Sequence, residues 1–391
     1  SAANTNTTYL GANTANSTVG IVNVTGKVDL RLDAQANNSD DLILRNINNN
    51  SYSGTRGDLL TRVNIGRVDI RNCNLVLDSL SLPGADYTVL LDNVLNTNTV
   101  FIPHNDASNR TYIDGNRIGG NVLFRQNVAT AANDYFCSGS RTTTSTGAKG
   151  NVYLGNLNLE LGGTVNGIIQ IGRYSTDSIY GNLNLSNWGI GDLYMSPGAG
   201  RLYVGGNATF TQTGTGQGWL WMLDGNVTIK GDFSITAPNT IIDFNVSTGN
   251  KISIGGKFNF DGNHTGSPTM TFVNFEVATN GGIFRTGAKA TGGTSSSVGP
   301  GKLIIRNSIL RDSIYEIYDI TNADIYDNQF FGDSLYLDQT LANSNTYIDG
   351  NKFNVRSSTF GMDCINSWVY FQSAFRASGT NLGNAYRGNV Y

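Results

Sequence analysis

The sequence has little of what long helices, charged surfaces or membrane spans require. Only 14% of its 391 residues are charged, and Glu160, Glu276 and Glu316 are the three glutamates. Because good helix formers are scarce, we expect few long helices. The longest apolar runs are shorter than the ~18 residues of a membrane-spanning helix, so we expect no membrane span. With a net charge of −3 and no basic run, the composition also argues against a nucleic-acid partner.

Histidine and cysteine are rare as well. His104 and His264 are the two histidines, and their neighbours predict loop positions. Of the three cysteines, Cys73 is expected to fill a small buried space. Cys137 and Cys364 lie in less regular segments, where they could form a disulfide within the chain or between subunits.

Glycine and asparagine are abundant, with 48 and 50 residues. Segments of alternating apolar and polar residues lie between glycines, for example NVTIKGDFSI (226–235) and KISIGGKFNF (251–260). This alternation is typical of β-strands with one buried face. The composition and pattern therefore predict an all-β protein.

Two parts of the chain repeat each other at an offset of 235 residues. GRVDIRNCNL (66–75) corresponds to GKLIIRNSIL (301–310), and TYIDGN (111–116) recurs as TYIDGN (346–351). The two copies are aligned without a gap. A shared offset at several places indicates a duplicated structural unit.

A shorter period lies inside each copy. Asparagines fall 21 and then 23 residues apart, in a template of an apolar residue, two variable residues, Asn, one variable residue and another apolar residue. A period of 20–25 residues with strand-like segments is typical of a solenoid. Asn suits the turn after each strand, and stacked turns would align equal asparagines about 4.8 Å apart. We therefore predict a structural Asn ladder made of Asn46, Asn72, Asn93, Asn116, Asn307, Asn328 and Asn351.

The segments IDGNRI (113–118), IYDNQF (325–330) and IDGNKF (348–353), with their spacing, resemble the parallel β-helix proteins of the pectate lyase and polygalacturonase type. The resemblance covers residues 42–120 and 302–355 well and the middle loosely. It implies a right-handed parallel β-helix, or β-solenoid, with inserted loops.

We expect one continuous solenoid over residues 1–391. Its predicted parts are N-terminal coils (1–65), repeat copy one (66–137), a glycine-rich β region (151–284), and repeat copy two with a C-terminal tail (302–391). Residues 138–149 and 285–301 are predicted to be inserted loops. A β-sandwich is the alternative for the middle region.

The resemblance does not extend to catalytic motifs. Asp40-Asp41 and Asn96-Thr97-Asn98 are the nearest matches, and the second lacks the carboxylate. We therefore assign no catalytic residue, metal ligand or cofactor, although a pair of carboxylates remains open. Asp-Gly-Asn turns offer oxygen atoms for calcium, but their turn chemistry explains them. These turns begin at Asp114, Asp224, Asp261 and Asp349.

The chain starts at Ser1 without a Met, which we interpret as the mature start of an exported protein, with a trimmed chain as the alternative. In composition it is similar to Asn/Gly/Thr-rich surface proteins of archaea and bacteria, such as the sheath subunits of methanogens. We expect an extracellular or cell-surface protein that assembles with itself into a layer, sheath or filament. The alternatives are a phage tailspike, a secreted polysaccharide-degrading enzyme, or an adhesin that binds glycans through aromatics such as Trp219, Trp221 and Trp368–Phe371.

Overall fold

In the computed structural model, the described residues form strands and turns. The described residues are 7–11, 22–23, 26–32, 41–61, 65–82, 85–104, 109–126, 135–139, 147–161, 168–188, 192–196, 200–212, 219–222, 225–236, 241–262, 269–286, 302–317, 322–339, 345–362, 368–370, 384–386 and 389–390. Within these ranges every regular element is a β-strand. No helix in them has the length and apolarity to cross a membrane.

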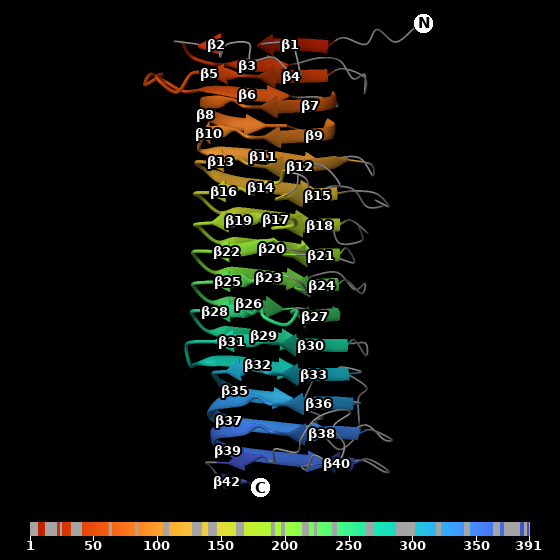
Figure 1. Cartoon of the computed structure of the whole chain (residues 1–391). Helices are drawn as coiled ribbons and strands as arrows, with labels where there is room; N and C mark the ends of the chain where they lie inside the picture. Colours follow the sequence, from red (N-terminus) through yellow and green to blue (C-terminus); the bar gives the residue numbers. More distant parts are fainter. Residues whose placement is uncertain are drawn as a thin grey trace, which may run out of the picture. The chain divides into compact units, whose positions relative to one another are not determined.

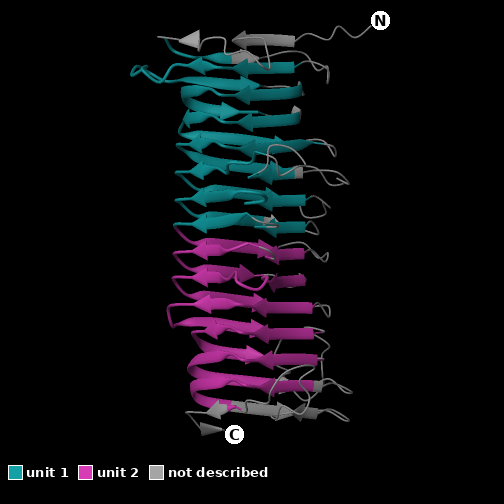
Figure 2. Ribbon diagram, viewed as in Figure 1, with its two compact units in different colours: residues 1–205 teal, residues 206–391 magenta. Residues whose placement is uncertain are grey.

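The chain divides into two compact units, Ser1–Gly205 and Gly206–Tyr391 (Figure 2). In each unit, strands stack in parallel columns, and each coil of the chain adds one strand to a column (Figure 1). The continuity of a single solenoid over all 391 residues stays a prediction.

Among the described residues of unit 1, the first column holds eight strands. They are β1 (Thr7–Gly11), β4 (Asp41–Arg45), β7 (Ile65–Arg71), β9 (Ala85–Leu91), β12 (Arg110–Asp114), β15 (Tyr135–Ser138), β18 (Ile168–Ile171) and β21 (Asp192–Met195). The second and third columns are built from β2 (Val22–Asn23), β3 (Leu30–Leu32), β5 (Ile47–Asn48), β6 (Gly57–Thr61), β8 (Asn74–Ser81), β10 (Val94–Asn96), β11 (Thr99–His104), β13 (Arg117–Ile118), β14 (Asn121–Gln126), β16 (Val152–Tyr153), β17 (Leu157–Leu161), β19 (Thr176–Ile179), β20 (Leu183–Trp188) and β22 (Arg201–Val204).

Unit 2 repeats this arrangement. Its first column is β24 (Trp219–Met222), β27 (Ile241–Asn245), β30 (Thr269–Val273), β33 (Lys302–Arg306), β36 (Asn322–Tyr326), β38 (Asn345–Asp349) and β40 (Trp368–Tyr370). The other two columns hold β23 (Ala208–Gln212), β25 (Val227–Ile229), β26 (Phe233–Thr236), β28 (Ile252–Ile254), β29 (Phe258–Gly262), β31 (Phe275–Val277), β32 (Gly282–Thr286), β34 (Ile309–Leu310), β35 (Asp312–Ile317), β37 (Gln329–Gln339), β39 (Lys352–Met362), β41 (Ala385–Tyr386) and β42 (Asn389–Val390).

The pairings define the fold as an all-β parallel β-solenoid. Neighbouring strands of each column run parallel, as β4 does with β7 and β27 with β30. Long strands take part in two columns, because β8 pairs with β10 through its first half and with β11 through its second. The middle region follows the same rule, since β14, β17 and β20 pair in parallel. The sandwich alternative is therefore wrong for these strands.

Alternation of side chains produces the core of each unit. Strand β17 shows the pattern, because Leu157, Leu159 and Leu161 are buried while the residues between them are half-exposed. In unit 2 the core is rich in phenylalanine, and the rings of Phe258 and Phe275 lie with centroids 4.7 Å apart. Burial of such side chains in successive coils is the main driving force for stacking them.

Candidate functional site

Buried asparagines form a hydrogen-bonded ladder along the turn between the first and second columns of unit 1. Asn93 Nδ2 donates to Asn116 Oδ1 at 2.9 Å, and Asn116 Nδ2 donates to Asn151 Oδ1 at 3.0 Å. The same two oxygens accept the main-chain N–H groups of Asn93 and Asn116. Asn116 Nδ2 also donates to Leu90 O at 2.7 Å, at the end of the preceding coil's strand. Each amide therefore ties successive coils together.

Unit 2 contains the same ladder. Asn328 Nδ2 donates to Asn351 Oδ1 at 3.0 Å, and Asn351 Nδ2 donates to Asn384 Oδ1 at 3.1 Å. Ser308 begins this ladder and Cys73 begins the other, because the main-chain N–H of each donates to the next Asn at 2.9 Å. A buried amide with all its groups paired stabilises the turn, whereas an unpaired one would be costly.

The structure places Asn93, Asn116, Asn328 and Asn351 in the ladder as expected. The placement of Asn46, Asn72 and Asn307 was wrong, because they lie one residue before it. Their φ angles are 56°, 52° and 49°, which is the left-handed region. The register confirms the shift, since Asn74 pairs with Val94 and Asn72 is therefore level with Asp92. Asn, Asp and Gly tolerate this backbone best. The left-handed position is held in other coils by Asp92, Gly115, Asp327 and Gly350.

Two ladder members, Asn151 and Asn384, were not predicted from the sequence. Asp177, which ends the ladder in unit 1, was not predicted either. Asp177 Oδ1 accepts Nδ2 of Asn151 at 3.0 Å, and Asp177 Oδ2 accepts the N–H of Gly172 at 2.8 Å. Burial raises the pKa of Asp177 to about 6, against the effect of these hydrogen bonds. The ladder thus ends in a buried carboxyl group that can change its charge near neutral pH.

A second buried carboxylate is surrounded by arginines on strand β7 and its neighbour. Asp69 accepts from Arg67 Nη2 at 2.6 Å, Arg71 Nε at 2.5 Å and Arg45 Nη2 at 3.0 Å. The carboxylate is completely buried beneath side chains that are 20–37% exposed. Three guanidinium groups thus donate charge-assisted hydrogen bonds to one carboxylate, which binds β7 to its neighbour β4.

The other candidate groups also have structural partners. His104 Nε2 lies 2.8 Å from Thr111 Oγ1, and both residues are buried. Asp114 accepts the main-chain N–H groups of Lys149 and Gly150 at 2.8–3.0 Å, which holds the next turn. Asp349 is buried at the corresponding place in unit 2. Among the described residues, no group of three or more His, Cys, Asp or Glu lies together as a metal site. His264 and Asp224 lie outside the described residues.

The cysteines for which the structure gives side chains are buried thiols. Cys137 is fully buried, with Gln170 Oε1 at 3.5 Å and Arg173 Nη1 at 3.7 Å from its Sγ. Burial raises the pKa of Cys73 and of Cys137 to about 11. Such thiols are poorly reactive, which argues against a subunit linkage through Cys137. Cys364 lies outside the described residues, so its pairing stays a prediction.

The core of unit 2 contains a carboxyl group without a partner. Asp312 is completely buried, and neither of its carboxyl oxygens has a hydrogen bond. Its main-chain N–H donates to Tyr315 Oη at 2.9 Å, and that hydroxyl donates to Phe331 O at 2.9 Å. Burial raises the pKa of Asp312 well above the usual carboxyl range. The group is therefore neutral in the folded protein over a wide pH range.

The predicted aromatic site is only partly described. Trp219 and Trp221 on β24 stack with ring centroids 4.8 Å apart and are half-buried. The side chains of 368–371 lie outside the described residues. Two half-buried rings that stack on each other offer limited area to a ligand.

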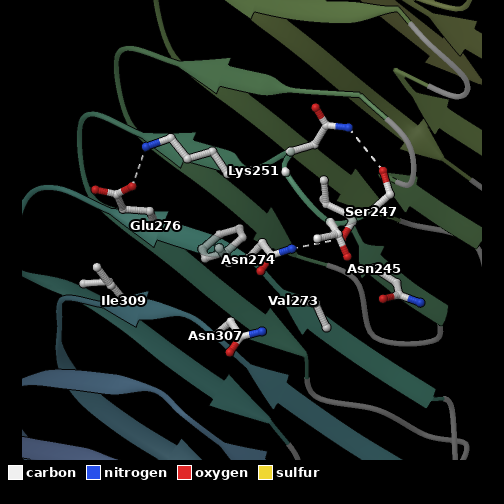
Figure 3. Close-up of a pocket in the computed structure, with 13 residues that line it drawn as sticks. Asn245, Ser247, Lys251, Val273, Asn274, Glu276, Asn307 and Ile309 are labelled. Carbon is white, nitrogen blue, oxygen red and sulfur yellow. Dashed lines mark hydrogen bonds and ion pairs between the residues drawn. The ribbon is translucent and has the colours of Figure 1, made fainter.

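A hollow of about 550 Å³ lies on unit 2 beside the turn between the first and second columns (Figure 3). Between the first and second columns, one residue joins β30 to β31 and two residues join β33 to β34, whereas six residues, Val246–Lys251, join β27 to β28. The longer loop lines the hollow together with the left-handed residues of the next two coils, Asn274 and Asn307. Asn274 Nδ2 donates to Val246 O at 3.1 Å and so fastens the loop to the following coil.

Comparison with family models, with curated proteins and with solved structures gives no match for this chain.

Proposed function

We propose that this chain is an exported structural subunit that assembles with itself, by strand stacking, into a cell-surface layer, sheath or filament. The observation that carries the proposal is the translational repetition of the ladder bonds. Successive coils of each ladder donate to and accept from one another in the same way, from Asn93 to Asn151 and from Asn328 to Asn384. The ladder of unit 1 ends within the chain at Asp177, whereas that of unit 2 reaches Asn384 in the last described coil, where a bonding pattern that repeats by translation can continue into a further copy of the chain.

The ends of the columns supply the second support. In the order of the described strands, β1 ends the first column of unit 1 and β40 ends that of unit 2. The edge of a strand presents main-chain N–H and C=O groups that pair readily with another chain. Pairing between copies would give these groups hydrogen-bond partners.

The use of the carboxylates favours a structural protein over a tailspike or a polysaccharide-degrading enzyme. Glycoside hydrolysis needs two carboxyl groups on either side of one bond. Here Asp69 is neutralised by arginines, Asp114 holds a turn and Asp177 ends a ladder. These carboxyl groups serve the stack itself.

Proline substitutions in the end strand test the proposal. Because successive N–H groups of a strand point to opposite sides, one of Thr8→Pro and Tyr9→Pro removes a donor that faces away from β4. That variant is expected to stay folded and to lose assembly in sedimentation velocity experiments. Ser53→Pro, in an exposed turn, is the control and should assemble normally. If the wild-type chain sediments as one small species at every concentration, the proposal is wrong.

A further inference from the structure

The hollow on unit 2 is lined by groups that both donate and accept hydrogen bonds. The side-chain amides of Asn245 and Asn307 border it, and both residues are exposed. The loop adds the hydroxyls of Ser247 and Thr248. Amides and hydroxyls match the hydroxyl groups of a polyol, which donate and accept in alternation.

The charges at the hollow cancel. Lys251 Nζ lies 2.7 Å from Glu276 Oε2, and they are the charged residues of the lining. Both are exposed, at 59% and 43% of their side chains, so each keeps hydrogen-bonding capacity toward a ligand. A net charge of zero gives no advantage to an acidic or a basic ligand.

Apolar side chains also line the hollow. Val273 and Ile309 are half-exposed on either side of Asn307 (Figure 3), and Phe275 is a buried residue of the lining. Pyranose rings carry C–H faces that pack on such surfaces while their hydroxyls bond to the polar rim. The volume of about 550 Å³ lies within the ~300–1,000 Å³ range of small-ligand sites.

The loop that makes the hollow is fixed in place before any ligand arrives. Asn250 N–H donates to Ser247 O at 3.0 Å, and Asn250 Nδ2 donates to Ser247 Oγ at 3.1 Å. Gly249 supplies the positive φ of 91° that this turn requires. Together with the bond from Asn274 to Val246 O, these contacts reduce the ordering cost of binding.

From these four observations we propose that the hollow binds a neutral oligosaccharide. Asn245 and Asn307 contact the sugar hydroxyls, Lys251 and Glu276 bond to the rim hydroxyls, and Val273 and Ile309 each offer an apolar surface to a ring face. Asn250 and Asn274 position the loop. The site does not depend on self-assembly, since its lining comes from one unit.

The duplication supplies a matched pair of variants for the test. Asn307 and Asn72 occupy the same repeat position with nearly the same φ, 49° and 52°. Gly115 and Gly350 hold equivalent left-handed positions, so Asn307→Gly and Asn72→Gly both keep the backbone conformation. Only Asn307→Gly removes an amide from the hollow.

The experiment is isothermal titration of the full chain with neutral cello-, malto-, manno- and chito-oligosaccharides, and with acidic oligogalacturonate. At least one neutral series is expected to bind, Asn307→Gly to weaken it about tenfold through the lost hydrogen bonds, and Asn72→Gly to change it less than twofold. Circular dichroism checks that both variants fold. The proposal is overturned if no neutral oligosaccharide binds at millimolar concentration, if only the acidic one binds, or if Asn72→Gly weakens binding as much as Asn307→Gly.

Discussion

Leu77 and Asp312 hold the same position of the 235-residue repeat, and both are completely buried. Leucine and aspartate have the same branched shape, so one site carries two methyl groups and the other carries two carboxyl oxygens. Leu77 has no polar side-chain atom that needs a partner, whereas both carboxyl oxygens of Asp312 lack hydrogen bonds. The two copies of the repeat therefore place an apolar and a polar side chain at the same position of the core.

Replacing Asp312 by leucine should stabilise the protein. Burying an unpartnered polar group costs about 1–3 kcal/mol, so Asp312→Leu is expected to raise the free energy of unfolding by about 2 kcal/mol. Chemical denaturation followed by circular dichroism measures the change. The reverse substitution, Leu77→Asp, is the matched control and should destabilise. A loss of stability in Asp312→Leu would show that the carboxyl group has a partner.

The stability of the wild-type chain should fall as pH rises. The folded state holds Asp312 protonated because its pKa is raised, whereas in the unfolded chain it ionises near pH 4. The contribution of Asp312 to the free energy of unfolding is therefore most favourable below about pH 4, and it becomes less favourable as the pH rises toward the folded-state pKa. Asp177 adds the same trend between about pH 4 and its folded-state pKa of about 6. The stability gap between Asp312→Leu and wild type should be larger at pH 8 than at pH 4, and an equal gap would contradict the neutral carboxyl.

Because Asn116 lies in the middle of the ladder, we expect its substitution to lower the stability of the fold strongly. Its Nδ2 donates to Leu90 O and Asn151 Oδ1, and its Oδ1 accepts from Asn93. Asn116→Asp keeps the acceptors, removes the donors and buries a charge, so it should cost about 3 kcal/mol or more at pH 7 and less at pH 4. Thermal unfolding at both pH values measures this. Asn351→Asp should lose a similar amount of stability in unit 2. A cost below 1 kcal/mol in both variants would contradict a stabilising role of the ladder.

Substitutions at the left-handed positions should change stability according to how well the new residue tolerates a positive φ. Asn72 and Asn46 are needed for their backbone conformation rather than for a ladder bond. Asn72→Gly should change the free energy of unfolding by only a few tenths of a kcal/mol, whereas Asn72→Val should cost about 1–2 kcal/mol or more. Melting temperatures of the two variants decide the point. An equal fall of the melting temperature in both variants would indicate that the side chain of Asn72 makes a ladder bond.

The thiol of Cys137 should be inert in the folded protein. It is fully buried and burial raises its pKa to about 11, so the reactive thiolate is scarce at neutral pH. Iodoacetamide should label Cys137 in the unfolded chain and leave it unlabelled in the folded one, as shown by peptide mass spectrometry. Rapid labelling under native conditions would place the thiol at the surface.

Much of this architecture could be predicted because it depends on short-range patterns. The alternation of apolar residues and the spacing of Asn93, Asn116, Asn328 and Asn351 reflect one coil stacked on the next. Asn72 and Asn307 were misplaced because Asn is suited both to the left-handed turn and to the ladder beside it. Only the register of strand pairing separates the two positions.

The remaining features depend on longer insertions. Asn151 and Asn384 follow their ladder neighbours by 35 and 33 residues, outside the short period, because extra residues extend those coils. The hollow lies between the loop Val246–Lys251 and residues of the next two coils, so it could not be predicted from the loop sequence alone. The neutral state of Asp312 depends on complete burial, which a position in an alternating segment does not reveal.

Electron microscopy of the purified native protein, with and without a thiol reductant, shows whether the chain assembles with itself. We expect ordered filaments, tubes or sheets whose repeat along the stack is set by the strand spacing of about 4.8 Å. Because Cys137 is buried, a loss of order on reduction would assign the linkage to Cys364. Discrete particles of one size under all conditions would contradict self-assembly and return the polysaccharide-degrading enzyme to first place.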